Sequence, residues 1–157
     1  AAQADTDLAA VAAEQMAELL RPACLRKQTM EVNRPDGPAL VPMNATMLAV
    51  LVRNLLDNAL RYSPDGAQVA VTIGAPTAHA GPTLTVEDSG PGLSDEDLQR
   101  LGDRFFRVLG TGQTGSGLGW SIVRRLARVH GLSIAVNRSP RWGGLRVQVG
   151  WPAGAGR

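Results

Sequence analysis

Two asparagines at helical spacing, followed by an arginine and a tyrosine, are the first residues whose types and positions could do chemistry. Asn54, Asn58 and Tyr62 are four residues apart, so on a helix they share one face. Arg61 lies beside the last of them. An asparagine side-chain oxygen can ligate Mg²⁺, a cation that takes few protein ligands and also binds substrate phosphates. Asparagine is a poor helix former, and a solvated polar face is the alternative interpretation; the repeated spacing favours binding.

The segment "VEDSGPGLS" carries a second candidate, Asp88, at the end of an expected strand with Gly90 and Gly92 in the following turn. A carboxylate beside backbone without side chains can accept a hydrogen bond from an exocyclic amino group. Such a site would prefer adenine to guanine, which presents an acceptor oxygen at that position. An ordinary strand-to-helix turn is the alternative, because this motif alone is weakly specific.

A glycine-rich segment, "GTGQTGSGLGW" over residues 110–120, is the third candidate. Its first glycines fit the G-x-G-x-x-G dinucleotide pattern, but that pattern requires an acidic residue about twenty positions later. No Asp or Glu follows Asp103, so the dinucleotide interpretation fails. Glycines let backbone N–H groups approach phosphates, and the N-terminus of a following helix favours an anion. The segment therefore predicts a different kind of phosphate-binding loop.

The elements that must position these groups follow from the hydrophobic pattern. Helical spacing and stop signals predict helices over residues 5–22, 44–62 and 118–130, and a short acidic helix over 94–102. Alternation predicts strands over residues 30–33, 40–42, 68–74, 83–87, 133–137 and 145–151, the first two around a "RPDGP" turn. Helices interleaved with hairpin-like strand pairs predict an α/β two-layer sandwich. Its mixed, mainly antiparallel sheet would carry about three main helices on one face.

Length and composition predict a single folded domain over residues 1–157, ordered over about 1–151 with a short tail at 152–157. The single cysteine, Cys24, excludes an internal disulfide and a multi-cysteine metal site. The single lysine, Lys27, follows no glycine-rich loop, which excludes the phosphate-binding lysines of P-loop proteins and protein kinases. Neither a signal peptide nor an apolar run of roughly 18 residues is present. We therefore expect a cytoplasmic domain that does not itself enter a membrane.

The charge of the chain is divided unevenly. Residues 1–103 carry all 14 acidic groups and a balance of −7, whereas residues 104–157 carry nine arginines and no acid. A basic segment can bind phosphorylated ligands, nucleic acid or an acidic partner. No basic stripe interleaved with aromatic residues accompanies it, so we expect no nucleic-acid binding.

Taken together, "NLLDNALRYSPDG", "VEDSGPGLS", "RFFRV" and "TGQTGSGLGWSIVRRLARVHG" resemble the N, G1, F and G2 boxes of the catalytic ATP-binding domain of bacterial two-component sensor histidine kinases. Their order and spacing match over nearly the whole chain. The short loop between "RFFRV" and "GSGLG" resembles the QseC/PmrB branch most. The resemblance implies the Bergerat ATP-binding fold, ATP and Mg²⁺ as cofactors, and transfer of the γ-phosphoryl group to a histidine.

The resemblance also implies roles for the residues on the asparagine helix. Asn58 would hold Mg²⁺ against the phosphates, and Asn54, one turn earlier, would support the site. Arg61 would help neutralise the phosphates, and Tyr62 would pack near the adenine. Asn58 and Arg61, together with Arg104 of the F box, are the implied catalytic residues.

The other boxes would complete the nucleotide site. Asp88 would accept the adenine amino proton, directly and through water, with Gly90 and Gly92 allowing close approach. Arg104 and Arg107 would lie near the phosphates and the partner domain. The ATP lid and the start of its helix, expected to order over the triphosphate, would comprise Gly115, Ser116, Gly117, Leu118 and Gly119.

The chain departs from the family pattern at two positions. The F box usually opens with a phenylalanine two residues before its arginine, where this chain has Gly102. Trp120 stands where leucine is usual. The first departure puts the packing of the lid against the partner domain in doubt, and the second is expected to change core packing only.

A phosphoacceptor motif of the type "H-E-x-x-T-P" is missing, because neither His79 nor His130 lies in that context. We therefore expect the acceptor histidine on a dimerisation hairpin of a larger parent protein, together with its sensor and membrane regions. The expected partners are that hairpin and a cognate response regulator. The isolated domain is expected to be a monomer, and the parent a homodimer in the bacterial inner membrane.

Two other classes stay open. One is an ATP hydrolase related to gyrase, mismatch-repair proteins and heat-shock chaperones, and the other is a non-catalytic nucleotide-binding or anti-sigma-like module. The hydrolases place a glutamate base one turn before the Mg²⁺ asparagine, where this chain has Asn54, which cannot take a proton from water. A lid of altered composition would favour the non-catalytic module, yet the lid glycines are all present.

Overall fold

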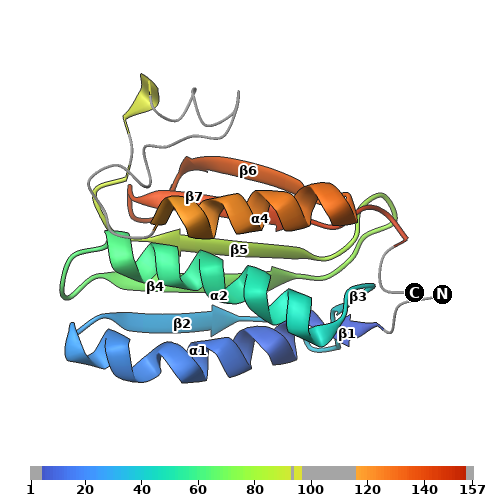
Figure 1. Cartoon of the computed structure of the whole chain (residues 1–157), viewed down its shortest axis with the longest axis horizontal. Coiled ribbons are helices and arrows are strands. Elements are labelled where there is room, and N and C mark those ends of the chain that lie inside the picture. Colours follow the sequence, from blue (N-terminus) through green and yellow to red (C-terminus); the bar gives the residue numbers. More distant parts are fainter. Residues whose placement is uncertain (1–4, 93, 97–115, 155–157) are drawn as a thin grey trace.

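The computed structural model describes residues 5–92, 94–96 and 116–154 of the chain. Their helices and strands alternate along the sequence and form two layers (Figure 1). In chain order the elements are β1 (Thr6–Asp7), α1 (Leu8–Leu25), β2 (Thr29–Asn33), β3 (Leu40–Val41), α2 (Ala45–Tyr62), β4 (Gln68–Gly74), β5 (Thr83–Asp88), α4 (Ser116–His130), β6 (Ser133–Arg138) and β7 (Leu145–Gly150).

One five-stranded sheet forms the base of the molecule, with the strand order β2-β4-β5-β7-β6. Strands β2 and β4 are parallel, and the other neighbours are antiparallel. Helices α1, α2 and α4 lie side by side on one face of this sheet (Figure 1). The predicted α/β two-layer sandwich with a mixed, mainly antiparallel sheet is confirmed.

The pairing of the first predicted strands differs from the expected hairpin. Strand β2 joins the main sheet beside β4, whereas β3 pairs with β1 in a separate two-stranded sheet. Prolines at 35 and 38 lie between β2 and β3, and they remove backbone donors from a hairpin ladder. Asp7 holds the second sheet in place, because its Oδ1 accepts hydrogen bonds from the backbone N–H groups of Ala9 and Ala39, both at 3.1 Å.

Helix α1 continues beyond its predicted end at Pro22 and stops at Leu25. The proline removes one helical hydrogen bond, but the buried stripe of the helix continues past it to Ala23, which is 1% exposed. The helix then ends in a Schellman motif. Lys27 has φ 57°, and the N–H groups of Lys27 and Gln28 donate to the carbonyls of Cys24 and Ala23.

The start of the first helix was also predicted wrongly: residues 6–7 form β1, and α1 begins at Leu8 because Asp7 is its N-cap. The other described elements agree with the sequence-based expectations to within a few residues. Asn44 caps α2 through a 2.8 Å hydrogen bond from the Met47 N–H group to its side chain. Trp120 is buried in the core between the helices and the sheet, as expected for a change in core packing. The acidic helix expected over residues 94–102 falls mostly outside the described residues, as does Gly102. No helix in the described part of the chain combines the length and the apolar character needed to cross a membrane.

Candidate nucleotide-binding site

The C-terminal half of α2 carries the predicted asparagines on one flank. Arg53 points toward α1, where its guanidinium pairs with Glu18 at 2.7 Å. Because α2 lies between α1 and α4, the flank that carries Asn54 and Asn58 is turned toward α4 (Figure 1). Both asparagines are half-buried. The helix therefore presents two amide side chains at the α2–α4 junction rather than on an open solvated face.

The two asparagine side chains differ in their hydrogen bonds. Asn54 donates its Nδ2 to the Val50 carbonyl at 2.7 Å, so its amide oxygen is left to accept or to ligate. The Nδ2 atom of Asn58 is buried and has no hydrogen-bond partner among the described residues. Buried polar groups are nearly always hydrogen-bonded, and an exception commonly marks the place of a missing ligand, ion or water. The Asn58 amide can thus donate a hydrogen bond to a ligand or a water.

The arginine and tyrosine at the end of α2 lie at different depths. Tyr62 is half-buried and packs against the core. Arg61 is exposed, and its Nη2 lies 3.1 Å from Oδ2 of Asp57, one helical turn earlier. A phosphate that binds Arg61 must therefore compete with this carboxylate.

Asp88 ends β5 on the helix-covered face of the sheet and is 5% exposed. Its Oδ1 accepts hydrogen bonds from the N–H groups of Gly90, at 2.9 Å, and Leu145, at 3.3 Å. Burial raises the pKa of this carboxyl group above its usual range, and the two hydrogen bonds partly offset that effect. Neither bond uses Oδ2, so the enclosed carboxyl group retains an oxygen with which to accept a ligand proton.

Glycines allow three segments to meet at Asp88. A Cβ atom at Gly90 would lie 3.1 Å from both Asp88 Oδ1 and Ser63 Oγ. Gly92 has φ 71°, a conformation that favours glycine. A Cβ atom at Gly144, in the loop between β6 and β7, would collide with the backbone of Asp88. The end of α2 and the β6–β7 loop therefore enclose the carboxyl group from two sides.

Sequence reasoning missed Ser63 and the contribution of residues 144 and 145. Ser63 reads only as the end of a helix before a proline, although it is 2% exposed in the structure. The Gly143–Gly144 pair reads only as a turn. Leu145 is 57 residues from Asp88 in sequence, and a backbone N–H group leaves no local signal of such a distant contact.

Several predicted site residues cannot be placed in this geometry. Arg104, Arg107 and Gly115 lie outside the described residues. Ser116, Gly117, Leu118 and Gly119 form the first turn of α4, and their side chains also lie outside the description. Among the described residues, no three His, Cys, Asp or Glu side chains cluster in a way that could hold a metal ion.

The family comparison assigns this two-layer sandwich, with its helix-borne asparagine pair and buried strand-end carboxyl group, to a class of ATPase domains. Residues 43–155 match the family model described as "Histidine kinase-, DNA gyrase B-, and HSP90-like ATPase", and the chain belongs to this family.

Its relatives narrow the class. The chain is 47% identical over 105 residues to the sensor protein QseC of Escherichia coli (strain K12), which covers 67% of the chain and 22% of that protein. It is 36% identical over 147 residues to the sensor protein kinase PmrB of Pseudomonas aeruginosa, which covers 93% of the chain and 30% of that protein. The chain thus spans less than a third of the length of these relatives.

Solved structures agree with the sequence relatives. The mycobacterial sensor histidine kinase MprB superimposes with a TM-score of 0.77 at 26% identity, covering 96% of this chain and 99% of that one. The cytoplasmic segment of the histidine kinase QseC superimposes with a TM-score of 0.69 at 27% identity, covering 96% and 78%. The chain is an ATP-binding kinase domain of the sensor histidine kinase class.

Proposed function

We propose that this domain binds Mg²⁺-ATP and donates the γ-phosphoryl group to a histidine on a separate dimerisation domain, for relay to a response regulator. The observation that best supports this proposal is the unpartnered, buried Nδ2 of Asn58 on α2, a helix that packs against the strand that ends at the buried carboxyl group of Asp88. In this family a nucleotide would bind with its base at Asp88 and its phosphates at Asn58.

The adenine end depends on a single buried acceptor. Asp88 has Oδ2 free of the two backbone hydrogen bonds, and Gly90 places no side chain against the carboxyl group. An adenine amino group would donate to this oxygen, whereas the carbonyl oxygen of guanine would face it with another acceptor. The site is therefore proposed to select ATP over GTP.

The phosphate end fits a cation held mainly by its ligand. Mg²⁺ usually keeps several waters and takes one or two protein ligands besides substrate phosphates, which suits the amide oxygens of Asn58 and Asn54. When bound, it would supply charge neutralisation for phosphoryl transfer. Arg61 would add positive charge after exchanging Asp57 for a phosphate oxygen. These residues would orient the triphosphate and neutralise its charge, and the nucleophile would come from the acceptor histidine.

The described residues argue against an ATP hydrolase. Asn54 occupies the position at which those enzymes place their glutamate base, and its Nδ2 is bonded within the helix. The nearest carboxylate on the same helix, Asp57, is paired with Arg61. No described group on α2 is therefore arranged to take a proton from water.

The parent protein is proposed to be a homodimer in the bacterial inner membrane, with this domain on the cytoplasmic side. The names of the relatives support that context, since they are sensor proteins and one solved structure is a cytoplasmic segment. The partners proposed for the domain are the histidine-bearing hairpin of its own parent and a cognate response regulator.

Calorimetry with a non-hydrolysable ATP analogue, with and without Mg²⁺, tests nucleotide binding, with ADP titrated beside it. We expect Mg²⁺ to tighten binding of the wild-type domain, and Asn58→Ala to remove that dependence. Asn137→Ala, at an exposed position on β6, is the matched control and should bind as wild type does. Absence of measurable heat at millimolar analogue and ADP would contradict the proposal.

Incubation with γ-labelled ATP and the separately produced hairpin tests the transfer. We expect acid-labile label on the hairpin, and no label when Asn58→Ala replaces the wild-type domain. A hairpin that stays unlabelled while the domain binds nucleotide would restrict the domain to nucleotide sensing.

A further inference from the structure

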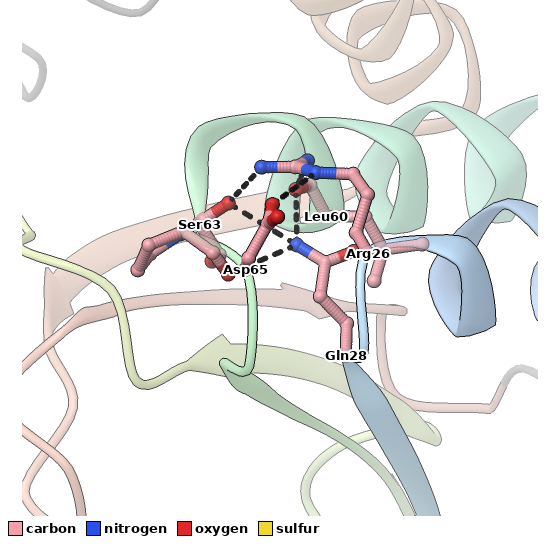
Figure 2. Close-up of polar contacts among 6 residues, drawn as sticks. Arg26, Gln28, Leu60, Ser63 and Asp65 are labelled. Carbon is pink, nitrogen blue, oxygen red and sulfur yellow. Dashed lines mark hydrogen bonds and ion pairs between the residues drawn. The ribbon is translucent and has the colours of Figure 1, made fainter.

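Two side chains from the turn between α1 and β2 bind the C-terminal end of α2 (Figure 2). The guanidinium of Arg26 donates to the carbonyls of Leu60, at 2.7 Å, and Ser63, at 2.6 Å. The Nε2 of Gln28 donates to the same two carbonyls, at 2.8 and 3.1 Å. We call Arg26 and Gln28 the carbonyl clamp. It joins the end of α2 to a turn that precedes that end by more than thirty residues.

The end of α2 depends on the clamp because its own cap is weak. The Ser63 N–H group reaches the Leu60 carbonyl at 3.4 Å, near the limit of a hydrogen bond, and Pro64 has no N–H to donate. The last carbonyls of a helix need partners. Short bonds from a charged guanidinium and a buried amide supply them. At its other end α2 is capped by its own Asn44.

The geometry of the clamp is fixed by the end of α1. The left-handed conformation of Lys27, between the two clamp residues, completes the Schellman motif and turns the chain into β2. Gln28 is 4% exposed, and its Oε1 is buried with no partner among the described residues. Only the donor end of this amide can face a cluster of carbonyl oxygens, so its orientation is set by α2.

The clamp acts on the residue that touches the Asp88 turn. Ser63, whose carbonyl both clamp residues bind, packs so closely on Gly90 that a Cβ atom there would lie 3.4 Å from Ser63 Cα. The Gly90 N–H group in turn donates to Asp88 Oδ1 at 2.9 Å. A continuous path of short contacts therefore runs from Arg26 and Gln28 through Ser63 to the buried carboxyl group.

We propose that Arg26 and Gln28 are positioning residues of the nucleotide site, which hold the end of α2 against the Asp88 turn. This proposal rests on the proposed function, because it assigns these residues a role in nucleotide affinity. The clamp fixes Tyr62 and Ser63 relative to Asp88, so that the base meets a preformed acceptor. Without the clamp the site still forms, but the end of α2 is held less firmly against the Asp88 turn.

Nucleotide titrations of four variants test the proposal. Arg26→Met and Gln28→Met remove the donors while keeping most of the side-chain bulk, and Arg26→Lys keeps the charge but loses the two-pronged donor. Arg53→Met is the matched control, since it breaks another α1–α2 contact, the ion pair with Glu18, away from the end of α2. We expect the Kd for ADP to rise about tenfold in the two clamp variants, less in Arg26→Lys, and less than about twofold in the control.

Hydrogen exchange of the nucleotide-free protein provides the second readout. Gly90 amide exchange is expected to accelerate in the clamp variants, while the amide of Val86, in the middle of β5, keeps its wild-type rate. Equal acceleration of Gly90 and Val86 would show that the clamp only stabilises the fold, and would overturn the proposal.

The two proposals fail in different ways. Unchanged ADP affinity in folded clamp variants, with a wild-type domain that binds ADP, overturns the clamp alone. A wild-type domain that binds no adenine nucleotide overturns the proposed function and the clamp with it.

Discussion

At the residue scale, the carboxyl group of Asp88 works against folding and in favour of binding. Burial raises its folded-state pKa above the unfolded value. The stabilising contribution of such a group is complete below the unfolded pKa and is lost as the pH rises through the folded pKa. The charged form of Asp88 is therefore less favourable in the empty site than in the unfolded chain, and an amino group that donates to Oδ2 would stabilise that charged form.

Asp88→Asn is expected to raise the free energy of unfolding of the nucleotide-free domain at pH 7. The amide oxygen can keep the hydrogen bonds from Gly90 and Leu145 without a buried charge. The gain should be smaller at pH 4 than at pH 7, because a lower pH favours the protonated form of the wild-type carboxyl group, whose pKa burial raises. Urea denaturation at both pH values measures the difference, and a variant less stable than wild type at pH 7 would contradict this account.

The same substitution is expected to weaken ATP binding by roughly 1–3 kcal/mol, the range for losing a hydrogen bond to a charged group. It should also narrow the gap between ATP and GTP, because an amide can turn its donor toward guanine. Competition titrations with both nucleotides measure the two effects. Unchanged ATP affinity would show that Asp88 does not read the base.

At the element scale, the turn from α1 into β2 carries a lysine where a glycine is usual. Lys27 adopts φ 57° in the Schellman motif, a conformation that costs a residue with a Cβ roughly 1 kcal/mol or more. The chain tolerates this cost at the position that separates Arg26 from Gln28. The strained turn and the carbonyl clamp are therefore parts of one local arrangement.

Lys27→Gly is expected to stabilise the domain by roughly 0.5–1 kcal/mol, since relief of the left-handed strain exceeds the entropy that glycine adds to the unfolded chain. Lys27→Ala removes the same charge but keeps the Cβ, so it should leave stability nearly unchanged. Thermal or urea unfolding of the three proteins makes the comparison. A glycine variant less stable than the alanine variant would show that the left-handed conformation of Lys27 is not strained.

The elements themselves were predictable because their signals are local. Alternation in β4 and β5 and the apolar stripe of α2 define those elements without reference to partners. The partners of β2 and β3 were not predictable, because two edge strands separated by a proline-rich turn can pair with each other or with other strands. The end of α1 was missed because the burial of Ala23 outweighs the break at Pro22.

The candidate site could be predicted only where its chemistry lies in a motif. The roles assigned to Asn58 and Asp88 stay predictions, with which the unpaired Nδ2 of Asn58 and the buried carboxyl group of Asp88 are compatible. The site was not predictable where a backbone N–H group or an ordinary polar side chain makes the contact. Gln28 reads as a surface residue in the sequence, and only the long-range contact with the end of α2 buries it.

At the scale of the whole molecule, the described residues form a candidate nucleotide site without a phosphoryl acceptor beside it. Phosphoryl transfer needs a nucleophile held in line with the γ-phosphate, and the described residues offer neither a histidine beside Asn58 nor a base for water. The chain alone is therefore expected to release phosphate from Mg²⁺-ATP only very slowly and to keep no acid-labile label. Rapid release that Asn58→Ala abolishes would instead identify a hydrolase.

The parallel pairing of β2 with β4 also bears on the order in which the molecule assembles. Strands β4 and β5 are joined by residues 75–82, and β6 and β7 by residues 139–144, so these hairpins close short loops. Thr29 meets Gln68 only after the whole of α2 has been passed, and closing the longer loop costs more chain entropy. Strand β2 should therefore dock after the rate-limiting barrier.

Met30→Ala, in β2, is accordingly expected to speed unfolding with little effect on refolding, whereas Val71→Ala, in β4, should slow refolding as well. Stopped-flow refolding and unfolding in urea separate the two rates. Since Arg26 and Gln28 arrive with β2, the turn at Asp88 would gain its final position only when β2 docks. A newly made domain would then become competent to bind nucleotide only once β2 has docked beside β4 and the β6–β7 loop has closed on Asp88.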